Sequence, residues 1–302
     1  MESRSSATPG KTVNTPSLLK IFAHHFALQL AETPNRNYPL RVQRYNKNFG
    51  GYHGETIDIA TVLREITTAA IAAGWRGETF YECPEFALTA WHRLPTTTPT
   101  TGKPRRIYIS AGIHGDEPAT TLTALRLLRE DLWPADAEII LIPCLNPSGF
   151  MINHRENAGG LDLNRDYLVP QSPEIRAHVA WLERQGQFNL CLCVHEDWEA
   201  HGFYLYELNP EQRPSLAEGM VAAVARVCPI DNSSVIEGRE AQGGIIRPSL
   251  DPRSRPQWPE AFWLISNKTA LCYTLEAPSD FPLATRVDAL TAATHAALAN
   301  CG

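Results

Sequence analysis

The chain has 302 residues, of which 43% are hydrophobic and 20% are charged, as is usual for a globular protein with a large buried core. Its formal net charge of −6 at pH 7 disfavours nonspecific binding to nucleic acid, because such binding depends on lysine and arginine. No stretch approaches about eighteen uninterrupted apolar residues, so we expect no transmembrane helix and no membrane partner.

The N-terminal third of the chain has a mixed pattern. Residues 1–16 are rich in Ser, Thr and Pro and lack the apolar region of a secretory signal, which predicts a disordered leader. Residues 17–100 are expected to form an N-terminal extension or subdomain, with helical spacing in "SLLKIFAHHFALQLAE" and "TIDIATVLREITTAAIAAG" and a strand at "TFYECPEFALTAWHRL". The pattern leaves open whether this extension narrows a cleft or adds edge strands to a sheet.

The seven cysteines are scattered without CxxC pairs, and several lie inside apolar runs such as "NLCLCVH". Buried thiols are therefore expected rather than disulfides or a metal cluster. This cysteine usage predicts a reducing, cytoplasmic location. The sequence does not indicate an oligomeric state.

From Lys103 onward, strands alternate with helices. Short apolar runs predict strands at "RRIYISAGI", "AEIILIPCL", "FNLCLCVH", "GFYLYEL" and "TALCYTLEA". Helices are predicted at "PATTLTALRLLRED", "SPEIRAHVAWLERQ", Pro214 to Cys228 and "PLATRVDALTAATHAALAN". The alternation predicts an α/β catalytic domain over residues 101–302, with a mixed, mostly parallel sheet covered by helices on both faces. In such sheets functional residues collect beyond the carboxyl ends of the strands.

The segment "SAGIHGDEPA" places His114 and Glu117 in the loop that follows an apolar strand. A pair three residues apart in a tight turn can direct both side chains at one cation, and imidazole nitrogen and carboxylate oxygen are ordinary zinc ligands. A solvated loop that contains His and Glu by chance remains possible on this motif alone.

A catalytic zinc site needs a third ligand and leaves one position for water. His195 in "LCLCVHEDWE" ends another apolar strand and is therefore preferred over His154 in a polar loop, His178 in a helix and His201 in a turn. The segment "HEDWEAH" is not an HExxH zinc helix, because its second histidine comes two residues late and the segment follows a strand.

Two further segments carry candidate polar residues. In "NHRENAGGLDLNRDY", Asp162 and Asn164 share a parity if the backbone is extended, so both can face one cleft. The Arg165 guanidinium can donate two hydrogen bonds to one carboxylate, which would suit substrate binding. The alternative is that Arg165 forms a surface ion pair. Glu276 in "LCYTLEAPSD" ends a strongly apolar strand, where a carboxylate is either a capping group or a functional base.

Together these signals resemble the carboxypeptidase A-like family of zinc metallopeptidases, over roughly residues 105–300. The compact spacing and the segment "RENAGGLDLNR" are most similar to its bacterial-type branch, near murein peptide amidase and succinylglutamate desuccinylase/aspartoacylase. The resemblance implies one Zn²⁺ ion held by His114, Glu117 and His195. It also implies that Asp162 orients the first of these histidines.

The resemblance further implies the roles of four residues. Glu276 would act as the general base, and Arg155 would polarise the scissile carbonyl. Asn164 and Arg165 would receive the terminal carboxylate of the substrate. The substrate-capping tyrosine and the pocket-determining residue of that family are not assigned by the sequence.

The implied function is zinc-dependent hydrolysis of the amide bond next to a C-terminal residue with a free carboxylate, in a small peptide. An N-acyl amino acid deacylase of the succinylglutamate desuccinylase/aspartoacylase type would use the same zinc ligands. A non-catalytic zinc-binding module would leave Glu276 and Arg155 without a purpose, and the absence of a GxSxG elbow disfavours a serine hydrolase.

Arg247, Arg253 and Arg255 indicate either a solvated loop, which we favour, or a pocket for acidic residues.

Overall fold

The computed structural model describes residue 44 and residues 54–98, 102–248 and 255–301. The leader predicted at residues 1–16 and the helix predicted over residues 17–32 lie outside this part of the chain. Within it, no helix has the length and apolar character needed to cross a membrane.

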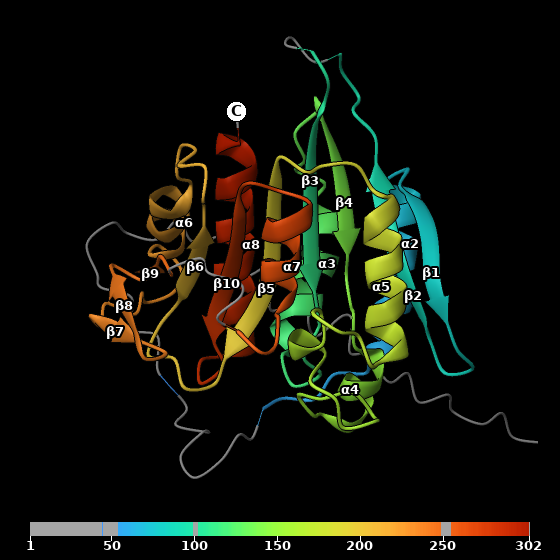
Figure 1. Cartoon of the computed structure of the whole chain (residues 1–302), viewed down its shortest axis with the longest axis horizontal. Coiled ribbons are helices and arrows are strands. Elements are labelled where there is room, and N and C mark those ends of the chain that lie inside the picture. The colour runs from blue at the N-terminus through green and yellow to red at the C-terminus, as the bar shows by residue number, and fades with distance from the viewer. Residues whose placement is uncertain (1–43, 45–53, 99–101, 249–254, 302) are drawn as a thin grey trace, which may run out of the picture. The chain divides into compact units, whose positions relative to one another are not determined.

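A ten-stranded mixed sheet forms the centre of the described structure, in the order β1-β2-β4-β3-β5-β10-β6-β9-β8-β7 (Figure 1). The strands are β1 (Arg76–Glu82), β2 (Ala87–Arg93), β3 (Arg105–Ala111), β4 (Ala137–Ile142), β5 (Leu190–Asp197), β6 (Tyr204–Leu208), β7 (Val235–Ile236), β8 (Arg239–Gln242), β9 (Ile245–Ile246) and β10 (Cys272–Pro278). Strands β4, β3, β5 and β10 are mutually parallel, and β6 pairs in parallel with β9. The remaining pairs, toward both edges, are antiparallel. The mixed α/β sheet predicted from the sequence is therefore confirmed.

Helices cover both faces of this sheet (Figure 1). They are α2 (Ile59–Ala72), α3 (Pro118–Glu130), α4 (Pro147–Ile152), α5 (Pro173–Arg184), α6 (Ala217–Val224), α7 (Glu260–Asn267) and α8 (Leu283–Asn300), with a 3-10 turn, η1 (Leu163–Arg165). One core holds α2, α3, α6 and α8 against the sheet through residues such as Ile66, Leu125 and Leu290. A second core holds α5 and α7 against the other face through Trp181 and Phe262. Each such fully buried side chain stabilises the fold by about 1.5–3 kcal/mol.

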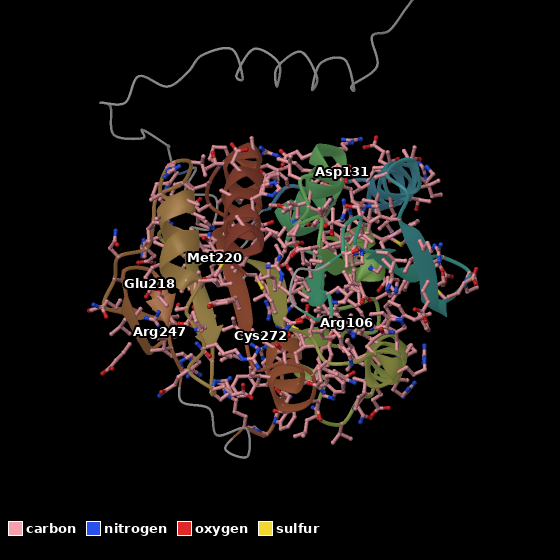
Figure 2. All side chains as sticks on the ribbon, turned by 90° about the horizontal axis from the view of Figure 1, so that it is seen from above. Arg106, Asp131, Glu218, Met220, Arg247 and Cys272 are labelled. Atoms are coloured by element: carbon pink, nitrogen blue, oxygen red, sulfur yellow. The ribbon has the colours of Figure 1, made fainter. Side chains whose placement is uncertain are left out.

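The central strands are buried on both faces, which is why they appear in the sequence as continuous apolar runs. Every residue of β5 from Leu190 to Glu196 is buried, and Cys272 at the start of β10 lies in the middle of the sheet (Figure 2). Because β3, β5 and β10 are parallel, their carboxyl ends meet at one edge of the sheet. All seven cysteines lie in the described part of the chain, and each is a free thiol.

Within the predicted N-terminal extension, residues 54–98 contribute an edge of the sheet. Asp58 caps the start of helix α2, because its side chain accepts a hydrogen bond from Thr61 N, and the helix packs against α3. The single strand predicted over residues 79–94 is instead a hairpin, β1–β2, whose turn is closed by Cys83 N donating to Phe86 O. The turn contains Pro84, which cannot donate a backbone hydrogen bond to a ladder.

The stretch between α6 and β10, which has no clear periodicity, forms the opposite edge. Strands β7, β8 and β9 add to β6, and α7 follows Pro259. Strands of two to four residues leave no periodic signal in a sequence, so this part of the sheet was not predicted.

Candidate metal centre and active site

His114, Glu117 and His195 come together at the carboxyl edge of the parallel strands. His114 lies in the loop that leaves β3, Glu117 is the residue that precedes α3, and His195 lies in β5. All three are buried, and one ligand atom of each lies within 4.8 Å of the others. The short loop between β3 and α3 therefore brings the HxxE pair beside the histidine of the neighbouring strand.

The donor set of this cluster matches that of a catalytic zinc site. His114 Nδ1 lies 2.5 Å from Glu117 Oε1, and His195 Nδ1 lies 3.1 Å from Glu117 Oε2. Burial opposes ionisation of Glu117, but the two imidazoles hold its pKa well below the usual range. Two imidazole nitrogens and one carboxylate are three protein ligands that leave a coordination position open, so these residues fit a zinc ion.

Asp162 faces His114 on the side of the ring away from Glu117. Its Oδ1 lies 3.4 Å from His114 Nε2, and its Oδ2 accepts a hydrogen bond of 2.9 Å from Arg155 Nε. Burial opposes ionisation of Asp162, but His114 and the Arg155 guanidinium hold its pKa well below the usual range. A carboxylate in this position fixes the orientation of a metal-binding imidazole.

Arg155 connects this carboxylate to the cluster. Its Nη1 lies 3.3 Å from His114 Nδ1 and 3.8 Å from Glu117 Oε1. Its side chain is 37% exposed, so the guanidinium faces both the buried ligands and the open cavity. This position suits a group that contacts a substrate next to a metal.

Glu276 lies directly beside His195 in the sheet. The two residues are register partners in the parallel β5–β10 pair, and on the other side Glu276 is opposite Tyr204 of β6. Glu276 is half-buried and lines the same cavity. Burial raises its pKa well above the usual range, although the His195 ring acts in the opposite direction. Of the two sequence interpretations, a functional position within the cavity agrees with this geometry.

Glu196, next to His195 in β5, is also buried. Its carboxylate accepts hydrogen bonds from Ala119 N at the start of α3, from Ser279 Oγ and from Arg286 of α8. Arg286 is fully buried. A buried carboxylate paired in this way ties β5, which carries His195, to the start of α3 and to the last helix.

Asn164 and Arg165 lie in η1, on another wall of the cavity. Asn164 is buried, and its side-chain Oδ1 accepts a hydrogen bond of 2.9 Å from Glu260 N at the start of α7. Because the oxygen is used in this way, the amide nitrogen of Asn164 is left as the donor for a ligand. Arg165 is exposed, and its Nη1 donates to the backbone oxygen of Asn164 over 2.8 Å.

A buried hydrogen-bond network connects to Asn164 through Glu260, and the sequence did not predict it. Glu260 accepts hydrogen bonds from Tyr108 Oη over 2.6 Å and from Ser110 Oγ over 2.8 Å. His178 bridges the hydroxyls of Tyr108 and Tyr167, at 3.0 Å and 2.8 Å. His178 is therefore a packing residue, which agrees with its exclusion from the metal site.

The other two histidines that competed for the third ligand position also lie elsewhere. His154 is exposed in the loop before Arg155. His201 follows a turn, where its ring contacts Arg44 and its backbone N–H donates to Asp231. Neither belongs to the cluster within the described residues.

A cavity of about 490 Å³ is lined by the His114, Glu117 and His195 cluster and also by the other candidate residues, which are Arg155, Asp162, Asn164, Arg165 and Glu276. Besides the cluster, it is lined by Cys193, Thr274 and Tyr206, which are register partners across β5, β10 and β6. Its polar lining also includes Arg239 and Arg255. From the sequence, Cys193, Thr274, Tyr206 and Arg239 had no place in the site, and for Arg255 a pocket was only the less favoured alternative.

The three arginines that precede the last strand separate in the structure. Arg247 forms ion pairs with Glu207 at 2.5 Å and with Glu218 at 2.7 Å, and Figure 2 shows it beside Glu218 at the outer edge of the molecule. Arg255 lines the cavity, which differs from the solvated loop that the sequence favoured. Arg253 lies outside the described residues.

Comparison with known proteins finds similarity over part of the chain. Residues 103–186 match the family described as the succinylglutamate desuccinylase/aspartoacylase catalytic domain. The match contains His114, Glu117 and the segment from Arg155 to Arg165, and it ends before His195 and Glu276.

Two curated relatives match parts of the chain. Carboxypeptidase SOL1 of Arabidopsis thaliana is 34% identical over 107 residues, which cover 28% of this chain and 21% of that protein. Murein peptide amidase A of Escherichia coli strain K12 is 35% identical over 91 residues, which cover 30% of this chain and 35% of that protein. The matched segments thus span only a minor part of these relatives.

The fold has a solved counterpart over most of its length. A candidate metallopeptidase from Shewanella baltica superposes with a TM-score of 0.69 at 23% identity, covering 81% of this chain and 93% of that chain. At this identity the likeness shows the fold. Together with the sequence matches, it confirms the resemblance to the carboxypeptidase A-like metallopeptidases.

Proposed function

Because the chain has the fold of these metallopeptidases and resembles hydrolases in its sequence, we propose that it is a zinc-dependent metallocarboxypeptidase. The proposed reaction is hydrolysis of the amide bond next to a C-terminal residue that bears a free carboxylate. The observation that carries the proposal is the shared cavity, which is lined by the His-Glu-His cluster, by Glu276 and by the Asn164–Arg165 pair.

In this proposal His114, Glu117 and His195 hold one zinc ion, and Asp162 orients the ring of His114. When bound, zinc polarises a carbonyl and lowers the pKa of water toward about 7. The cluster supplies the three protein ligands that such chemistry requires.

Glu276 is proposed as the general base. Its place beside His195 on the neighbouring strand puts its carboxylate within the cavity and next to the cluster. There it can take a proton from water and deliver it to the amine that leaves.

Arg155 and the pair of Asn164 and Arg165 are proposed to contact the substrate. Arg155 is fixed by Asp162 and reaches the edge of the cluster, where a guanidinium can stabilise the developing oxyanion by about 3 kcal/mol. The Asn164 amide nitrogen and the exposed Arg165 guanidinium offer donors for a terminal carboxylate.

The family match favours a second candidate, a deacylase of N-acyl amino acids. Such an enzyme would use the same zinc ligands and the same carboxylate donors, so the site geometry does not separate the two reactions. The name of murein peptide amidase A suggests cell-wall-type peptides among the substrates to test.

The test is to incubate the zinc-loaded full chain with peptides, cell-wall-type peptides and N-acyl amino acids, with and without a chelator, and to identify products by mass spectrometry. Release of a C-terminal residue that stops with the chelator would support the carboxypeptidase, and release of an acyl group would support the deacylase. If the zinc-loaded protein cleaves none of these pools, the proposal fails and a zinc-binding module is favoured. A His195→Ala variant that still bound one zinc ion would remove His195 from the proposed ligands.

A further inference from the structure

Three arginines, Arg165, Arg239 and Arg255, line the proposed active-site cavity. They come from η1, from the start of β8 and from the segment that leads into α7. Among the residues that the structure describes, none of the three forms an ion pair with a carboxylate. The other nearby arginines differ, because Arg155 is paired with Asp162 and Arg247 with two glutamates.

Arg255 is held in place by an aromatic ring. Its guanidinium carbon lies 4.4 Å from the centre of the Phe262 ring, and its side chain is half-buried. Burial lowers the pKa of Arg255, and the charges of Arg239 and Arg165 lower it further. The three guanidiniums thus repel one another in a confined space, and a bound anion would relieve this repulsion.

The cavity continues from the proposed base to Arg255. Thr274 lies two residues before Glu276 on β10, and its partner Tyr206 on β6 is close enough to Arg255 to affect its pKa. All of these residues line the cavity. A substrate side chain that lay beside the register partners Thr274 and Tyr206 would therefore end near the Arg255 guanidinium.

Two exposed acids, Glu199 and Glu237, line the same cavity. Neither forms an ion pair with these arginines within the described residues. Asp162 is close enough to Arg165 for the arginine's charge to lower its pKa, but no described carboxylate forms an ion pair with Arg165, Arg239 or Arg255. The three guanidiniums can therefore still form ion pairs with a ligand.

We propose that the leaving amino acid is dicarboxylic, with its side-chain carboxylate bound by Arg255 and Arg239 while its terminal carboxylate is bound by Asn164 and Arg165. This inference rests on the proposed carboxypeptidase function and names its substrate class. Glutamate and glutamine have side chains of nearly the same shape and differ in charge. A comparison of the two therefore isolates the contribution of the side-chain charge.

The first experiment compares N-acyl-alanyl peptides that end in glutamate, glutamine or lysine, with zinc-loaded protein. The value of kcat/KM should be at least about tenfold higher for glutamate than for glutamine, because charge-assisted hydrogen bonds are roughly twice as strong as neutral ones. Arg255→Gln should reduce this ratio to within about twofold, and Arg255→Lys should keep part of it. The control is Arg226→Gln, which removes the same charge from an exposed arginine without an ion pair to any described residue. It should leave the ratio unchanged.

The second experiment separates failure of this inference from failure of the proposed function. Free L-glutamate and L-glutamine are titrated calorimetrically into the zinc-loaded Glu276→Gln variant, with and without Arg255→Gln. Tighter binding of glutamate that depends on Arg255 would support the anion subsite even if no peptide were cleaved. Cleavage of the two peptides at equal rates, together with equal affinities for the two amino acids, would overturn the inference and leave the proposed hydrolase standing.

Discussion

Gly115 lies between two proposed metal ligands and against the backbone of α4. A Cβ atom at this position would contact Gly149 C and Phe150 N and would lie 2.5 Å from Gly149 Cα. The loop is also bonded to the Arg155 segment, because Gly115 N donates to Arg155 O over 3.4 Å. Gly115→Ala should therefore displace the loop that carries His114.

The size of the effect follows from these distances. Non-bonded carbon atoms pack about 3.5–4.0 Å apart, so the loop or α4 must move by at least about 1 Å. Overpacking usually costs about 1–3 kcal/mol, and we expect about 3 kcal/mol because the atoms in the way are backbone and cannot rotate aside. A misplacement of about 1 Å can lower catalysis about 100-fold, and zinc affinity should fall with it.

The assay is urea unfolding of metal-free and zinc-loaded protein, with zinc affinity measured by competition with a coloured chelator. The matched control is Gly219→Ala in α6, where a Cβ atom would meet nothing within 4 Å. That change should stabilise the helix by about 0.5–1 kcal/mol. If Gly115→Ala bound zinc and resisted urea as well as the unmodified chain, the close contact between Gly115 and α4 would not constrain the loop that carries His114 and Glu117.

Three further predictions address the site and the fold. Glu276→Gln should abolish turnover while one zinc ion per chain remains bound, and loss of the metal in elemental analysis would contradict its assignment as the base. Arg165→Ala should raise KM for peptides with a free terminal carboxylate by about tenfold or more, whereas equal losses on amidated peptides would refute carboxylate binding. Glu130 is paired with Arg126 and His295, and although burial opposes its ionisation, these partners lower its pKa below the ordinary 4.5. Its stabilising effect should be complete above the ordinary value and lost as the pH falls through the lowered pKa. Glu130→Gln should therefore cost about 0.5–1 kcal/mol at pH 7, and the cost should shrink progressively as the pH falls below 4.5, measured by urea unfolding.

The parts of the fold that the sequence predicted are those with a local signal. The central strands β3, β5 and β10 are continuous apolar runs, and His114, His195 and Glu276 were selected because they end such runs. Parallel pairing then brings those ends together, which a pattern of alternating strands and helices already implies. The structure places these three residues in one cavity.

The rest of the site depends on pairings between residues far apart in the chain. Glu260 is buried because Tyr108 and Ser110, about 150 residues away, donate to its carboxylate, and no local pattern indicates this. Arg255 and Arg247 have similar sequence surroundings, yet one enters the cavity and the other pairs with Glu207. Which arginine turns inward is decided by the tertiary positions of its neighbours.

The buried pair of Glu196 and Arg286 affects how this protein can be shortened or divided. Arg286 belongs to α8, the last helix, whereas Glu196 is bonded in sequence to the proposed ligand His195. Removing one partner of a buried ion pair typically costs about 3–5 kcal/mol, because the remaining charge has no compensation. A chain truncated before α8, or split into two fragments there, should therefore lose metal affinity as well as stability. The C-terminal helix therefore supports the proposed metal centre, although none of its side chains lines the cavity among the described residues.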